Sequence, residues 1–224
     1  MKREVKRERT LPAFSMGIGE LEVLCKRLTE QFENPEDVYI SIDITLPSES
    51  LEFKGVEELK QYSALRGRIT KFRLWFSQGG RHVSIWSSSF FGSLPEVGAT
   101  AETEAWCAGA IETVNAFIQS NKLWYHWFVS APIGWILFIF ANIPSIVLLF
   151  LPQGQSLDKS VFAGWLAITI SLAILYFFRA RLLPSSVIVV TREESFVRRN
   201  AAELSLVVAI ASAVLTVVGW FVGK

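Results

Sequence analysis

The chain has 224 residues, 51% of them hydrophobic, and a formal net charge of +1 at pH 7. This balance excludes a chain that is basic or acidic throughout, although local charged patches can still govern binding. With two cysteines and two histidines, the chain has no disulfide framework and too few ligands to favour a Cys/His metal site. Charge is unevenly distributed: residues 1–126 hold 15 Lys or Arg and 17 Asp or Glu, whereas residues 127–224 hold 7 and 4.

The first 17 residues are expected to form a basic N-terminal tail. They begin MKREVKRERT, and no apolar run follows before Ile18, so we do not expect a secretory signal peptide here. The next segment, residues 18–124, is therefore expected to be a domain that stays in the cytoplasm.

The first half of this domain shows a helix, a strand and a short helix in turn. Apolar residues recur on one helical face over residues 18–32, and Asn34 with Pro35 would end that helix. Residues 38–45 alternate between apolar and polar, as in a half-buried strand, and a short helix is predicted over residues 56–65.

The second half adds a hairpin and a longer helix. Strands are predicted near residues 68–76 and 81–88, on either side of Gly79 and Gly80, which favour a tight turn. A helix is expected over residues 101–119. The whole order predicts an α+β fold, a small antiparallel sheet with helices on one face.

The other face of that sheet is the candidate ligand site. Alternation places Thr70, Phe72, Leu74, Phe76, Val83 and Ile85 toward the helices. The candidate ligand-binding residues on the opposite face are Lys71, Arg73, Trp75, His82 and Trp86, with Ser84, Tyr39, Ser41 and Asp43 beside them. Positive charge combined with aromatic rings suits a nucleotide or single-stranded nucleic acid. The alternative is an ordinary solvated or subunit-contacting sheet face.

Residues 125–224 are expected to form an all-α transmembrane domain of three helices, because three apolar segments reach the roughly 20 residues that cross a bilayer. The predicted spans are residues 127–151, 160–178 and 204–223. The connection at residues 179–203 is rich in arginine, which predicts a cytoplasmic N-terminus, an outside C-terminus and a multi-pass inner-membrane location. Within it, residues 185–191 form either a strand or part of an amphipathic segment along the bilayer surface.

The third predicted span carries a stripe of small residues at helical spacing: Ser205, Ala209, Ser212, Thr216 and Gly219. Such residues favour close helix packing, and the alternative is that several copies line a pore with this face. Because the stripe needs a partner surface and three uncharged helices cannot enclose a wide aqueous path, we expect a cyclic homo-oligomer, a tetramer with this span near its axis. No ionisable residue lies within the spans, which disfavours an ion-coupled transporter.

Catalytic motifs for phosphate-binding loops, serine hydrolases, zinc proteases and dinucleotide enzymes are absent from the sequence. We therefore expect no enzyme activity, no cofactor and no metal. Cys25 and Cys107 lie on the apolar sides of predicted helices and are expected to be buried, reduced thiols.

One stretch of the chain resembles a known kind of protein. It reads FKGVEELKQYSALRGRITKFRLWF, then GRHVSIWSS and, after a helix, NKLWYHWF. This pattern, over residues 51–128, is similar to the cytosolic part of bacterial membrane proteins with a sensor domain, including membrane effectors of anti-phage defence systems of the Hailong type. The resemblance assigns no site residue.

What the resemblance implies is a membrane effector: a homo-oligomeric ligand-gated ion channel, or a membrane-disrupting pore, that a nucleotide-derived signal opens or holds shut. The expected partners are then the lipid bilayer, further copies of the chain, and a nucleotide, an oligonucleotide or a cognate regulatory protein. The alternative is a non-conducting membrane scaffold whose cytosolic domain recruits a protein partner.

Overall fold

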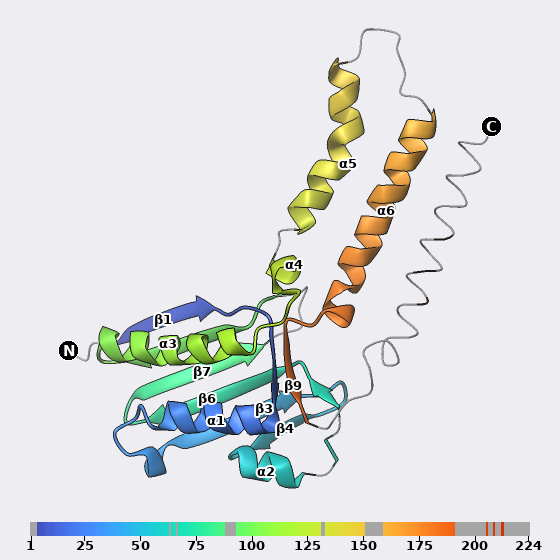
Figure 1. Cartoon of the computed structure of the whole chain (residues 1–224). Coiled ribbons are helices and arrows are strands. Elements are labelled where there is room, and N and C mark those ends of the chain that lie inside the picture. Colours follow the sequence, from blue (N-terminus) through green and yellow to red (C-terminus); the bar gives the residue numbers. More distant parts are fainter. Residues whose placement is uncertain are drawn as a thin grey trace. The chain divides into compact units, whose positions relative to one another are not determined.

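The computed structural model describes residues 4–62, 64–65, 67–87, 93–130, 133–150 and 159–190, with Ser205, Val208 and Ser212 as single residues (Figure 1). The chain divides into two compact units. Unit 1 comprises Met1–Ser130 and Leu183–Glu193, and unit 2 comprises Ala131–Leu182 and Glu194–Lys224. Both β-sheets lie in unit 1.

A six-stranded antiparallel sheet forms the centre of unit 1. Its strands lie in the order β1 (Val5–Thr10), β8 (Glu96–Ala101), β7 (Arg81–Ser87), β6 (Phe72–Gln78), β3 (Tyr39–Thr45) and β4 (Ser50–Phe53). Gly79 and Gly80 form the turn between β6 and β7 with φ of 58° and 87°, as a two-residue hairpin with positive φ at both positions requires. The predicted hairpin is confirmed.

Two helices, α1 (Ile18–Thr29) and α3 (Glu104–Ser120), cover one face of this sheet (Figure 1). Leu24 and Leu28 of α1, and Val114 and Ile118 of α3, are fully buried at this interface. The sheet contributes the buried side chains predicted for it, among them Phe72, Leu74, Phe76, Val83 and Ile85. Burying this continuous apolar surface is the main force that holds the layers together. No helix of unit 1 that the structure describes covers the other face of the sheet.

Shorter elements complete the N-terminal part of unit 1. They are the 3-10 helix η1 (Pro35–Asp37), α2 (Val56–Gln61) and α4 (His126–Ser130). Glu20 accepts a hydrogen bond from the Gly17 backbone N–H at 2.7 Å, which satisfies one of the free donors at the start of α1.

A second, three-stranded sheet brings a late part of the chain into unit 1. Its middle strand, β9 (Ser186–Val189), pairs parallel with β2 (Phe14–Gly17) and antiparallel with β5 (Arg68–Ile69). Of the two alternatives for residues 185–191, the structure therefore contains the strand. Ser87, at the end of β7, is hydrogen-bonded through its hydroxyl to the Ser186 hydroxyl, which connects the two sheets.

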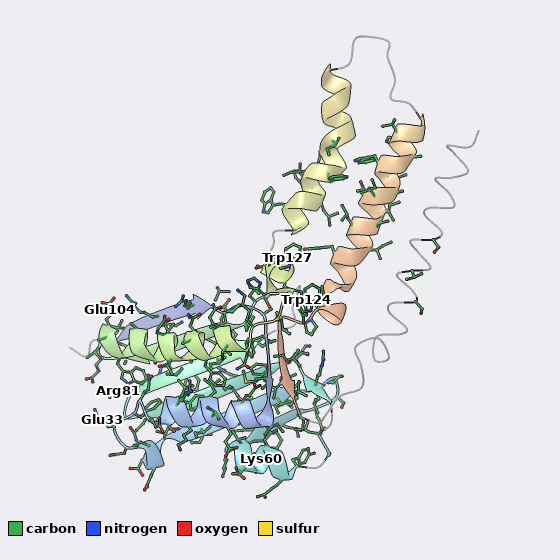
Figure 2. The ribbon with its side chains drawn as sticks, in the orientation of Figure 1. Glu33, Lys60, Arg81, Glu104, Trp124 and Trp127 are labelled. Atoms are coloured by element: carbon green, nitrogen blue, oxygen red, sulfur yellow. The ribbon has the colours of Figure 1, made fainter. Side chains whose placement is uncertain are left out.

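The expected basic tail contains two of these strands, β1 and β2. In β1, Arg7 and Arg9 form ion pairs with Glu104 and Glu112 of α3 (Glu104 is labelled in Figure 2). The outer edge of the sheet is thus a charged strand, a usual protection of sheet edges. Strands β4 and β8 were also absent from the sequence-based prediction.

Unit 2 contains two helices among its described residues, α5 (Ile133–Phe150) and α6 (Lys159–Leu182). The Trp165 indole N–H donates to the Phe140 carbonyl at 2.9 Å. A Cβ placed on Gly134 would lie 3.5 Å from the Tyr176 hydroxyl. The start of α5 is therefore close to the end of α6, and the two helices are antiparallel.

The membrane predictions are wrong. In the part of the chain that the structure describes, no helix is both long enough and apolar enough to cross a bilayer. The fold is a sheet-rich α+β structure. This finding contradicts the predicted three-helix transmembrane region, the multi-pass inner-membrane location and the inside–outside topology. The ion-channel interpretation required those spans and is dropped with them.

For the first predicted span, the physical reason is that hydropathy averaged along a segment does not define one continuous helix. The predicted span 127–151 is divided between α4 and α5, which belong to different units. The span 160–178 lies within α6, which continues through Arg179 and Arg181. The span 204–223 lies outside the described residues apart from Ser205, Val208 and Ser212, and so do Ala209, Thr216 and Gly219 of the small-residue stripe.

Candidate functional site

The face of the six-stranded sheet opposite α1 and α3 carries three rows of side chains that run across the strands. The register aligns Lys6, Thr100, His82, Ser77 and Tyr39 in one row, Glu8, Gly98, Ser84, Trp75 and Ser41 in the next, and Thr10, Glu96, Trp86, Arg73 and Asp43 in the third. These residues come from strands far apart in the sequence. The antiparallel ladder alone brings them together.

A cavity of about 490 Å³ opens on this face, within the range of about 300–1,000 Å³ that small-molecule sites occupy. Its lining comes from β1, β8, β7 and β6, and consists of Lys6, Glu8, Arg73, Trp75, His82, Ser84, Trp86, Gly98 and Thr100. We call it the sheet-face hollow.

Small residues make the floor of the hollow. Ser84 and Thr100 are only 6% and 3% exposed although they lie on the open face, because larger side chains stand around them. Gly98 lies beneath Trp86, since a Cβ on Gly98 would be 3.1 Å from Cζ3 of the Trp86 indole. Gly98 therefore permits the Trp86 ring to lie against the sheet.

The Trp75 ring is in contact with both His82 and Arg73. It is parallel to the His82 ring, with centroids 4.8 Å apart and an interplanar angle of 18°. The Arg73 guanidinium carbon lies 5.1 Å from the Trp75 ring centroid, within cation–π distance. Trp75 therefore helps to hold both Arg73 and His82 in place.

The charge in the hollow is mainly that of Arg73. Lys6 and Glu8 form an ion pair at 2.7 Å, and this hydrogen bond raises the pKa of Lys6. Arg73 forms no ion pair with any residue that the structure describes. Burial lowers the pKa of the His82 imidazole; the charge of Glu4 opposes this effect and that of Lys6 adds to it. At neutral pH His82 is therefore mainly uncharged.

An acidic group of side chains borders the hollow on β3 and β4. The Ser41 hydroxyl donates to Asp43 at 3.0 Å, and the Tyr39 hydroxyl donates to Glu52 at 3.2 Å. This hydrogen bond to Glu52 raises the pKa of Tyr39. The open face is thus divided into a basic, aromatic half and an acidic half.

Four of the five candidate ligand-binding residues line the hollow: Arg73, Trp75, His82 and Trp86. Lys71 does not. It precedes β6, its side chain is exposed, and its carbonyl accepts from the Thr45 N–H at 3.0 Å.

Sequence reasoning missed the contributions of β1 and β8. Lys6 and Glu8 were assigned to the tail, and Gly98 lay outside every predicted helix and strand. The alternation of Val97, Ala99 and Ala101 with Gly98 and Thr100 was the available signal, but small residues give a weak strand pattern.

Metal binding and thiol chemistry have little support among the described residues. They contain no group of three or more His, Cys, Asp or Glu side chains placed to hold a metal ion. Cys25 and Cys107 are free and buried, as predicted, and burial raises the pKa of Cys25 to about 12. Neither thiol is a ready nucleophile.

No family model, curated protein or solved structure matches the chain. The resemblance to anti-phage membrane effectors therefore stays an untested prediction. What remains is the chemistry of the hollow itself, namely one guanidinium, an ammonium–carboxylate pair, two indoles and a hydroxyl-lined floor. Such a set can bind an anionic group and a planar ring together.

Proposed function

We propose that unit 1 is a ligand-binding domain whose sheet-face hollow takes a small anionic molecule with a planar ring, of the nucleotide class. The observation that carries this proposal is the convergence of Arg73 with Trp75 and Trp86 around a floor of small polar residues. Phosphate recognition by proteins commonly uses a guanidinium, because its planar fork can donate two parallel hydrogen bonds.

The surroundings of Arg73 support this role. A cation without an acidic partner keeps its donors available, and the Trp75 ring restrains the guanidinium without consuming them. Ser84 and Thr100 offer hydroxyls at the floor, and Glu8 offers an acceptor for sugar hydroxyls or an exocyclic amine. The hollow thus matches the three parts of a nucleotide: phosphate, sugar and base.

The test is calorimetric titration of the full chain with AMP, comparing wild type with Arg73→Met and Lys71→Met. Loss of charge-assisted hydrogen bonds worth about 1.5–3 kcal/mol predicts a roughly 10- to 150-fold weaker Kd for Arg73→Met. Lys71→Met removes the same kind of charge two residues away but outside the hollow, and its Kd should stay within about twofold.

Equal losses in both variants would show that only general positive charge matters, and would refute the assignment to the hollow. The proposal would also fail if a folded wild-type chain bound neither AMP nor ATP at millimolar concentration.

A second candidate function, recruitment of a protein partner, is favoured by two exposed aromatic side chains, one just before α4 and one within it. Trp124 is 80% exposed and Trp127 is 61% exposed (Figure 2). Tryptophan is enriched at the centres of protein interfaces. A wild-type chain that binds no nucleotide in the titration would make this function the better account, with a further copy of the chain as the first partner to examine.

A further inference from the structure

The two tryptophans of the hollow are not equivalent. On β6, Arg73 comes two residues before Trp75, whereas His82 lies opposite Ser77, two residues after it. The two side chains therefore approach the Trp75 ring from opposite ends, Arg73 at 5.1 Å from its centroid and His82 stacked at 4.8 Å. The register thus places Arg73 and His82 on either side of Trp75, and each lies over its ring.

A ligand ring would gain little by stacking on Trp75. It would have to displace either His82 or Arg73, so that one ring contact would replace another of similar strength. Displacing Arg73 would also move the cation that the ligand's anionic group needs. The position of Trp75 suits a residue that holds Arg73 and His82.

Trp86 has a different environment. The edge of its six-membered ring rests on β8, where a Cβ on Gly98 would approach Cζ3 at 3.1 Å and Cη2 at 3.3 Å. Its neighbour across the strand pair is Arg73, and both residues line the hollow. A ring on Trp86 would therefore place its attached phosphate within reach of the Arg73 side chain.

Resting on the proposed function, we infer that the hollow takes a single ring on Trp86 and a single phosphate group on Arg73, and that its ligand is a mononucleotide rather than a single-stranded nucleic acid. Proteins that bind single strands use successive aromatic platforms along a basic groove. Among the residues that the structure describes, none stacks on Trp86, and because Lys6 is paired with Glu8, Arg73 is the cation left for a phosphate.

The test uses the full chain with four probes: AMP, ribose 5-phosphate, thymidine monophosphate and the oligonucleotide dT8. Wild type should bind AMP about 5- to 150-fold more tightly than ribose 5-phosphate, the range expected for one stacked base. It should bind dT8 no more than about eightfold more tightly than thymidine monophosphate, because an octamer offers eight alternative nucleotides to a site that takes one.

Substitutions then show on which tryptophan the ring of the ligand stacks. Trp86→Leu should remove most of the AMP preference and leave ribose 5-phosphate binding within about threefold. Gly98→Ala, whose added methyl would press on the Trp86 ring, should change the AMP preference more than the binding of ribose 5-phosphate. Trp75→Leu should instead weaken AMP and ribose 5-phosphate by the same factor, because it loosens Arg73. Gly109→Ala is the control for Gly98→Ala, since nothing lies within 4 Å of the added methyl, and it should bind as wild type does.

The outcomes separate this inference from the proposed function. If dT8 binds tenfold or more tightly than thymidine monophosphate, or if Trp75→Leu removes the AMP preference while Trp86→Leu does not, the inference is wrong and the proposed function stands. If none of the four probes binds, both fail. Thermal melting of each variant shows whether it is folded, and Trp86→Phe, which keeps a smaller ring, should retain part of the preference if Trp86→Leu does not fold.

Discussion

The docking of β9 into unit 1 can be tested by shortening Ile188. This side chain is fully buried in the main core, although its partner in β5, Ile69, lies more than 110 residues earlier in the sequence. Ile188→Ala removes three carbons, worth about 2.4 kcal/mol at roughly 0.8 kcal/mol each. The cavity left behind raises the expected loss in free energy of unfolding to about 2–5 kcal/mol.

Urea unfolding of the full chain, followed by near-ultraviolet circular dichroism, measures this loss. With a denaturant slope of about 2 kcal/mol per M, the midpoint should fall by roughly 1–2.5 M. Ile168→Ala makes the same chemical change at a side chain that is 53% exposed, and should shift the midpoint by less than about 0.5 M. Equal small shifts in both variants would refute the burial of β9 in the core of unit 1.

Two further predictions concern titratable groups. Because Cys25 and Cys107 are buried and burial raises both pKa values, iodoacetamide at pH 8 should label neither thiol in the native chain and both in urea; stoichiometric native labelling would contradict the core packing. Burial places the folded-state pKa of His82 below its unfolded value, near 6.5, so below that pH the unfolded chain binds more protons and stability should fall. The urea midpoint of wild type should accordingly fall more than that of His82→Gln between pH 7.5 and pH 5, and an identical fall in both would show that His82 is not responsible.

Much of the candidate site could be predicted because a strand has a side-chain period of two. Alternation in β6 and β7 was enough to separate Leu74 and Ile85 from Arg73, Trp75 and Trp86. The same periodicity gave the hairpin, with Gly79 and Gly80 as a strong local signal. These features depend only on residues near each other in the chain.

The remaining part of the hollow could not be predicted, because it depends on long-range pairing. Lys6 and Glu8 alternate with Arg7 and Arg9, so no apolar face marks β1 as a strand. Only the ladder with β8, about 90 residues later, gives β1 its place at the sheet edge. The stacking of His82 on Trp75 likewise arises from the pairing of neighbouring strands, and no sequence pattern reports it.

The membrane prediction failed for the same reason, because it ignored long-range contacts. Hydropathy describes the composition of a segment, but whether the segment becomes one helix, two helices or a strand depends on the contacts it finds. Residues 127–151 divide between α4 and α5, and the connection beyond α6 returns to unit 1 as β9 between β2 and β5. Local periodicity thus determined which side chains of this protein share a face. The tertiary structure decided which faces meet, because backbone pairing and core burial join residues that the sequence keeps far apart.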